Sequence, residues 1–244
     1  MSAAGMAGRL RGSAGSGYGV AFLTMLEPKL NPLRLALIGM SGCGKTFWAN
    51  RLADAGHSVV SCDARIEERL RAELHPAGHR GVTGLAAWMG SPGEPQYGER
   101  AGRYLAAETS VMEEVLAALE RDPHQERVLD TTGSVVYTGE AIGARLRKLM
   151  TVVYLQASPQ EEALLIQRYT IHPKPVLWRD AYEPREGETP RETLVRCFPA
   201  LVEGRRRLYE AWAHCALPTR VLHEEGMDAS RLLRLIEENC RCAE

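Results

Sequence analysis

The fold is decided by one stretch, Gly39-Met40-Ser41-Gly42-Cys43-Gly44-Lys45-Thr46, which has the pattern GxxxxGK[ST]. It follows an apolar run of strand length and precedes a helical pattern that ends at Gly56. In this context the backbone N–H groups turn inward around a phosphate, and the start of the helix adds partial positive charge. The sequence therefore predicts a phosphate-binding loop for a nucleoside triphosphate.

Side chains of this loop have separate expected roles. The Lys45 ammonium can reach the outer phosphates, and the Thr46 hydroxyl can ligate Mg²⁺. Asp130 ends a later apolar strand, a position from which phosphate-loop enzymes commonly support Mg²⁺, so it is the second expected metal ligand. The residues expected to bind ATP through the loop are Gly39, Ser41, Gly42, Cys43, Gly44, Lys45 and Thr46.

Apolar runs of strand length alternate with helical patterns along the rest of the chain. The expected strands are Leu35–Gly39, Ser58–Ser61, Arg127–Asp130, Thr151–Leu155 and Thr219–Leu222. Because these runs are nearly continuous in apolar residues, they indicate strands covered on both faces, and the intervening helices make the sheet parallel. We therefore expect an α/β fold, a doubly wound parallel sheet of about five strands with helices on both faces.

Local signals refine this outline. Ser158–Glu161 and Thr189–Glu192 have the capping-box pattern with proline at the first helical position, so each predicts the start of a helix. Two segments, His75–Tyr97 and Thr170–Glu188, contain several prolines and are expected to be irregular. Long loops in compact domains usually serve as lids or binding segments.

Composition limits the class of protein. The chain has 244 residues, 45% of them hydrophobic, and 30 Lys+Arg against 31 Asp+Glu give a formal charge of -1. This balance gives no sign of a nucleic-acid or anionic-membrane partner, and no apolar run approaches the ~20 residues that span a bilayer. One globular domain over residues 32–244 is expected.

The first 31 residues differ from the rest. They are rich in Gly, Ala and Ser and contain no acidic residue before Glu27, a composition that cannot bury a core. We expect residues 1–31 to be a disordered extension, with Met25 as a candidate start and an organellar transit peptide as the alternative. The six cysteines are scattered without CxxC spacing, which favours a reducing compartment and a cytoplasmic location.

After the second expected strand the chain reads Ser61-Cys62-Asp63-Ala64-Arg65-Ile66-Glu67. Together with the phosphate loop, this segment resembles shikimate kinase, and the resemblance extends from Leu33 to the C-terminus. It implies that Asp63 contacts the acceptor hydroxyl and helps to take its proton, whereas Ser61 replaces an aspartate that assists the metal. A carboxylate just past a parallel strand lies where ligands bind in open sheets, which supports a role for Asp63 independently. A helix N-cap is the alternative for Asp63.

The resemblance also implies acceptor-binding residues. Thr131-Thr132-Gly133 corresponds to the family's Gly-Gly-Gly turn, so Thr132 and Gly133 are expected at the acceptor. The threonines add β-branched side chains where the family's backbone meets its substrate, so we expect an acceptor other than shikimate. Arg103, in a pattern similar to Gly-Glu-x-x-Phe-Arg, is expected to clamp an acceptor carboxylate. Arg205 stands at a second acceptor-binding arginine, with a basic helical face as the alternative.

Lid residues follow from the same comparison. Lys174-Pro175-Val176-Leu177 is similar to the family's Arg-Pro-Leu-Leu, which makes Lys174 an expected catalytic residue. Arg168 precedes this segment and is expected to bind ATP. The acceptor-binding segment then spans residues 64–110 and the lid residues 170–189.

These observations predict ATP- and Mg²⁺-dependent phosphoryl transfer to a hydroxyl of a small metabolite, with Lys45, Asp63 and Lys174 as catalytic residues. Arg103 and Arg205 suggest that the acceptor is anionic. ATP and this small-molecule acceptor are the expected partners of a monomeric enzyme. A nucleoside or nucleotide kinase and a non-catalytic ATP-binding regulatory protein are the alternatives, since both share the phosphate loop.

Overall fold

The computed structural model describes residues 32–171 and 174–241. The chain divides into two units, residues 1–31 and residues 32–244. The expected N-terminal extension coincides with the first unit and lies outside the described residues.

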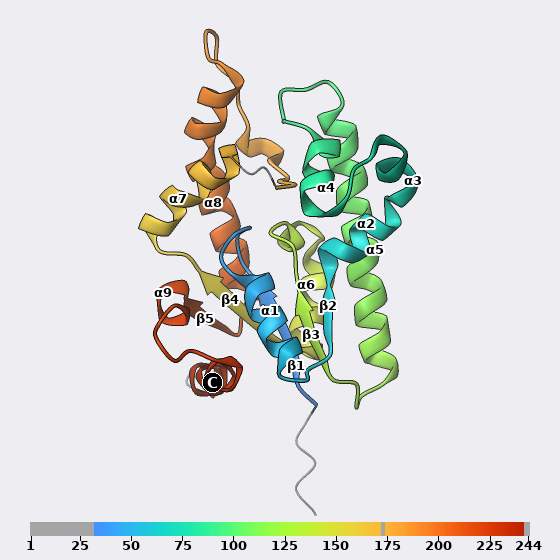
Figure 1. Cartoon of the computed structure of the whole chain (residues 1–244), viewed down its shortest axis with the longest axis vertical. Helices are drawn as coiled ribbons and strands as arrows, with labels where there is room; N and C mark the ends of the chain where they lie inside the picture. Colours follow the sequence, from blue (N-terminus) through green and yellow to red (C-terminus); the bar gives the residue numbers. More distant parts are fainter. Residues whose placement is uncertain (1–31, 172–173, 242–244) are drawn as a thin grey trace, which may run out of the picture. The chain divides into compact units, whose positions relative to one another are not determined.

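Five parallel strands form the central sheet (Figure 1). They are β1 (Arg34–Ile38), β2 (Val59–Ser61), β3 (Arg127–Asp130), β4 (Thr151–Gln156) and β5 (Cys215–Pro218). Their order is β2-β3-β1-β4-β5, so β1 lies at the centre and the chain builds the sheet outward on both sides of it. The predicted parallel α/β sheet is confirmed, and four of its strands lie where the sequence places them.

The sequence predicts the fifth strand at Thr219–Leu222, and this prediction is wrong. Thr219–Leu222 forms the short helix α9, and β5 precedes it. In β5, Cys215 and Leu217 are buried at strand spacing and pair with β4. Thr219 and Leu222 are also buried, but at the three-residue spacing of a helix. A short apolar run fits either element, and burial periodicity decides between them.

Helices cover both faces of the sheet. Their bounds are α1 (Lys45–Asp54), α2 (Cys62–Arg69), α3 (Arg71–Leu74), α4 (Gly81–Met89), α5 (Tyr97–Arg121), α6 (Glu140–Leu149), α7 (Pro159–Ile171), α8 (Pro190–Trp212), α9 (Thr219–Leu222) and α10 (Ala229–Arg241). Short 3₁₀ turns occupy His75–Ala77, Val135–Tyr137 and Arg179–Ala181. Both predicted capping boxes are present, at the starts of α7 and α8.

Alternate residues of β1 enter two separate cores. Ala36 and Ile38 pack with residues of α2, α5, α6 and α8 on one face. Leu35 and Leu37 pack with residues of α1 and α10 on the other. All four side chains are at most 1% exposed, which explains why the strand is apolar from Leu35 to Ile38. This burial fixes β1, and with it the loop that follows.

The two segments expected to be irregular differ in outcome. His75–Tyr97 contains α4, so the expectation is wrong for its central part. Leu85, Trp88 and Met89 are buried along that helix, and tertiary packing of this kind stabilises short helices against their glycines. The segment that follows α7 has little regular structure, although residues 172 and 173 lie outside the described part.

Across the ranges 32–171 and 174–241, no helix combines the length and the apolar composition needed to cross a membrane.

Candidate active site

The phosphate loop lies between β1 and α1, at the carboxyl end of the sheet (Figure 1). Gly44 is the residue before α1 and has φ 96°, a left-handed conformation in which a side chain is strained. The Lys45 side chain is 6% exposed. Its ammonium donates hydrogen bonds to Gly39 O at 2.8 Å and Met40 O at 3.0 Å. The loop therefore holds a cation at its centre, as a phosphate-binding loop requires.

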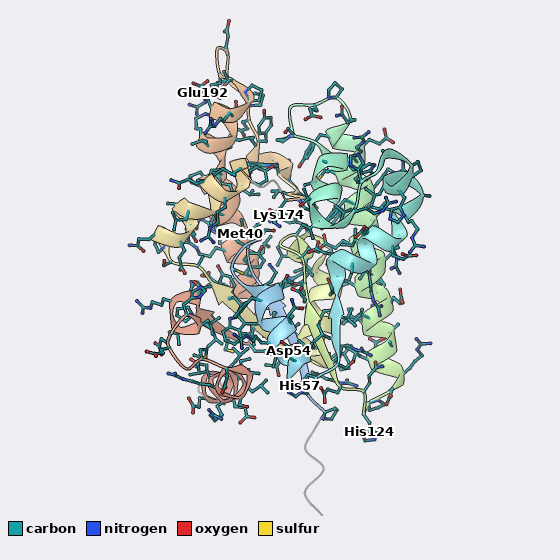
Figure 2. All side chains as sticks on the ribbon, in the orientation of Figure 1. Met40, Asp54, His57, His124, Lys174 and Glu192 are labelled. Carbon is teal, nitrogen blue, oxygen red and sulfur yellow. The ribbon has the colours of Figure 1, made fainter. Side chains whose placement is uncertain are left out.

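A cavity of about 270 Å³ opens beside the loop. Seven segments line it: the loop, α1, the start of α2, one residue each of α4 and α5, the turn after β3, and the segment after α7. The lining residues are Ser41, Gly42, Gly44, Lys45, Thr46, Phe47, Asp63, Val82, Tyr104, Thr131, Thr132, Gly133, Lys174 and Pro175. Figure 2 shows the labelled Met40 and Lys174 toward this end of the sheet, with His57 and His124 at the opposite end.

Asp130 and Thr46 form a site with the chemistry of a magnesium ligand pair. Asp130 is 4% exposed, and its Oδ1 atom is buried without a hydrogen-bond partner. Burial raises the pKa of Asp130, although the Lys45 ammonium and a hydrogen bond from Thr46 oppose the rise. A buried, unpartnered carboxylate oxygen beside a hydroxyl fits a hard cation such as Mg²⁺, which prefers oxygen ligands.

Asp63 lies in the first turn of α2 and lines the cavity. The helix begins at Cys62, and its cap is the Ser61 side chain, which accepts a hydrogen bond from Ala64 N. The N-cap alternative for Asp63 is therefore wrong. Burial raises the pKa of Asp63, although the Lys45 ammonium opposes the rise. Its Oδ1 atom accepts a hydrogen bond from the Tyr104 hydroxyl at 3.4 Å.

The turn after β3 lies against the phosphate loop. A Cβ atom on Gly133 would lie 2.9 Å from Ser41 Oγ and 3.0 Å from Ser41 N, so the close approach of the two segments requires glycine there. Thr131 and Thr132 precede it and are buried. The Thr131 hydroxyl donates to Leu37 O at 2.7 Å, which turns it toward the sheet rather than the cavity.

Glu108 was missed by the sequence interpretation. It lies on α5, is fully buried, and accepts hydrogen bonds from the hydroxyls of Thr132 and Ser134, the latter at 2.7 Å. Burial raises its pKa to about 7, although these two hydrogen bonds oppose the rise. A signal was available in the sequence. An acidic residue interrupts the apolar stripe that Tyr104, Val111 and Val115 continue at helical spacing.

The structure places neither predicted acceptor arginine in the cavity. Arg103 is half-exposed on α5 and pairs with Glu73 at 2.6 Å and Glu99 at 3.7 Å. It lies five residues before Glu108, so the two side chains leave the helix in different directions. Arg205 is 1% exposed and donates to the carbonyls of Gly133 and Leu177 at 2.9 and 3.0 Å.

The remaining predicted residues lie on either side of the loop. Lys174 lines the cavity from the segment after α7. Arg168 lines a second, smaller cavity of about 140 Å³ on the other side of the loop, together with Thr219 and His223. The expected lid, residues 170–189, is attached to α5 within its first half, because the Tyr97 hydroxyl donates to Val176 O at 2.8 Å.

The fold is similar to solved structures of shikimate kinases. A shikimate kinase from Acinetobacter baumannii in complex with shikimate is 24% identical, with a TM-score of 0.52, over 86% of this chain and 96% of that chain. The enzyme from Bacteroides thetaiotaomicron is 20% identical with a TM-score of 0.52, over 84% and 97%. The enzyme from Aquifex aeolicus is 13% identical with a TM-score of 0.52, over 86% and 99%.

No protein-family model and no curated protein matches the sequence. Sequence identities this low establish a likeness of fold. With its parallel sheet, its helices on both faces and its phosphate loop at the carboxyl end of the central strand, the chain has the P-loop fold of the shikimate kinases.

Proposed function

We propose that this protein transfers the γ-phosphoryl group of ATP to a hydroxyl of a small metabolite. The observation that carries the proposal is the shared cavity of Lys45 and Asp63. A cation suited to the outer phosphates and a carboxylate suited to an acceptor hydroxyl line one space, which is what in-line transfer between two bound substrates requires.

The chain's own residues supply most of the chemistry. Asp63 accepts the proton of the acceptor hydroxyl, whose oxygen forms the new bond to the γ-phosphorus while the bond to the ADP oxygen breaks. The raised pKa of Asp63 makes it a better proton acceptor than an exposed aspartate. Lys45, the loop amides and Lys174 stabilise the negative charge on the phosphates during transfer.

Thr46 and Asp130 are the residues that would hold Mg²⁺. When bound there, the metal supplies further neutralisation of phosphate charge. On the opposite side of the loop, the second cavity has room for part of the nucleoside. Arg168 and His223 line it, and both side chains can stack on or hydrogen-bond to an aromatic base.

Lys45→Ala tests the donor site. The variant should lose at least about a hundredfold in ATP turnover, because the phosphates lose a buried point charge. Lys148→Ala, which removes an exposed lysine from α6, is the matched control and should keep wild-type turnover. Circular dichroism checks that both variants fold. Turnover of Lys45→Ala within about tenfold of wild type would contradict the proposal.

A second measurement separates an enzyme from a nucleotide-binding regulator. ADP formation is followed with a panel of hydroxyl compounds, and phosphorylated products are identified by mass spectrometry. A compound that raises ADP formation and gains a phosphoryl group supports the proposal. ATP binding without any ADP formation would favour the regulator.

A further inference from the structure

Two cysteines from different elements meet where the last helix packs on the sheet. Cys215 is the first residue of β5, and Cys240 lies in the last turn of α10. Their Sγ atoms are 2.9 Å apart. A disulfide joins its sulfur atoms at about 2.05 Å, so a displacement of less than about 1 Å brings these two thiols to bonding distance.

Regular structure on both sides holds the two thiols at this distance. In β5, Cys215 pairs in register with Val153 of β4. On α10, Leu232, Ile236 and Cys240 follow one another at four-residue spacing, so they share one face of the helix. The first two are at most 5% exposed and belong to the core that contains Cys215. The approach of the sulfur atoms is therefore set by the packing of a helix on a strand.

The two thiols differ in their access to solvent. Cys215 is buried, whereas Cys240 is partly exposed. Burial raises the pKa of Cys215, so this residue remains a protonated thiol at neutral pH. A dissolved reagent therefore meets Cys240 first, and Cys215 is placed to react second. The other described cysteines, Cys43, Cys62 and Cys197, are buried.

We infer that Cys215 and Cys240 form a reversible disulfide bond, with a low-molecular-weight disulfide such as oxidised glutathione as the oxidant. The Cys240 thiolate attacks one sulfur of the glutathione disulfide, whose S–S bond breaks and releases one glutathione. Cys215 then loses its proton, attacks the Cys240 sulfur and releases the second glutathione. Two protein thiols are oxidised, one glutathione disulfide is reduced, and the two glutathione molecules take up the two protons.

This bond ties the C-terminal helix to β5, the strand at one edge of the sheet. It closes a covalent ring from residue 215 to residue 240, which removes conformations from the unfolded chain and so stabilises the folded one. Helix α10 packs against β5 and α1, and its Leu232 and Ile236 share a core with Trp48 and Leu52 of α1. Oxidation therefore stabilises the core that supports the helix after the phosphate loop. The inference is independent of the proposed function.

Peptide mapping of the wild-type protein tests the bond directly. The protein is equilibrated with oxidised glutathione at about 1 mM, or with dithiothreitol, then treated with iodoacetamide and digested with trypsin. The bond joins tryptic peptides 208–220 and 235–241, whereas Cys242 falls in the separate peptide 242–244. More than half of the protein should carry the linked pair after oxidised glutathione, and it should be absent after dithiothreitol. A bond between Cys240 and Cys242, or glutathione retained on Cys240, would overturn the inference.

Thermal unfolding tests the effect on stability. Oxidised wild-type protein should have a Tm at least about 5 °C above that of the reduced protein. Cys240→Ser should lose both the linked peptide and this difference. The matched control is Cys197→Ser, whose thiol contacts Glu183 O at 3.8 Å, and it should keep both.

Two results of these measurements would contradict the inference. Equal Tm values for oxidised and reduced wild-type protein would mean that the bond does not stabilise the fold. A difference that persists in Cys240→Ser would mean that other cysteines are responsible. Because the peptide map uses wild-type protein, it decides whether the bond forms even if Cys240→Ser fails to fold.

Discussion

Replacing Glu108 by glutamine should change how the free energy of unfolding depends on pH, because the buried carboxyl has a strongly perturbed pKa. Burial raises this pKa from 4.5 to about 7. The folded protein therefore binds a proton between these pH values that the unfolded chain has already released. By linkage, the free energy of unfolding falls as pH rises through this window. At about 1.4 kcal/mol per pKa unit, the loss amounts to about 3 kcal/mol.

Glutamine does not titrate, so the variant should escape this loss. Relative to wild type, it should gain roughly 2 to 3 kcal/mol between pH 5 and pH 8. The groups that face Glu108 are Asp63, Arg205, Cys62, Tyr104 and the hydroxyls of Thr132 and Ser134. They are common to both proteins, so the difference between variant and wild type isolates the titration of Glu108.

Urea unfolding at pH 5, 6, 7 and 8 measures the effect, provided that the m value is equal in the two proteins. Glu113→Gln is the control and should differ from wild type by less than about 0.5 kcal/mol at every pH, since exposed ion pairs contribute little. A constant difference between Glu108→Gln and wild type across the four pH values would refute the reasoning, because it would mean that Glu108 does not titrate in this range.

Three further predictions concern the site. Asp63→Asn should lower the rate of transfer by a factor of about 10²–10⁴ while the KM for ATP changes little, since the amide cannot accept a proton. Steady-state kinetics with an active acceptor measures both quantities, and an unchanged rate would mean that Asp63 is not the base. Asp130→Asn should raise the Mg²⁺ concentration for half-maximal activity about tenfold or more, and a Mg²⁺ titration that overlays wild type would contradict the metal assignment. Arg205→Met should lower the free energy of unfolding by roughly 3 to 5 kcal/mol, because it leaves buried carbonyls unpaired. Arg103→Ala should lower it by less than about 1 kcal/mol. Similar losses for the two variants in urea unfolding would mean that the difference in burial between the two arginines has no energetic consequence.

Local signals in the sequence were sufficient for the central features of the fold. The phosphate loop has a fixed pattern between a strand and a helix, and β1 is apolar from Leu35 to Ile38 because both of its faces are covered. Thr219–Leu222 was misassigned because a run of four residues has no decisive period. Helix α4 was missed because its stability comes from burying Leu85, Trp88 and Met89 rather than from helix propensity.

The part of the site formed by α5 and the turn after β3 was harder to predict, for a physical reason. Which residue of α5 faces the turn after β3 depends on the rotation of that helix about its axis, and a shift of five residues exchanges Arg103 for Glu108. Similarly, the sequence around Arg205 is basic, but only tertiary packing shows that its guanidinium is enclosed. Arg206 and Arg207 in the same run pair with Glu162 and Glu203, as a solvated helical face predicts.

The enclosed guanidinium of Arg205 has a consequence for how this protein tolerates divergence. Its partners at Gly133 and Leu177 are main-chain carbonyls, which every amino acid possesses. The attachment between the turn after β3 and the segment after α7 therefore does not depend on which side chain occupies position 177. Side chains that line the cavity can therefore be substituted while the spacing between these segments is preserved. Such backbone-mediated attachment gives a physical reason why a chain only 24% identical to a solved shikimate kinase has the same fold.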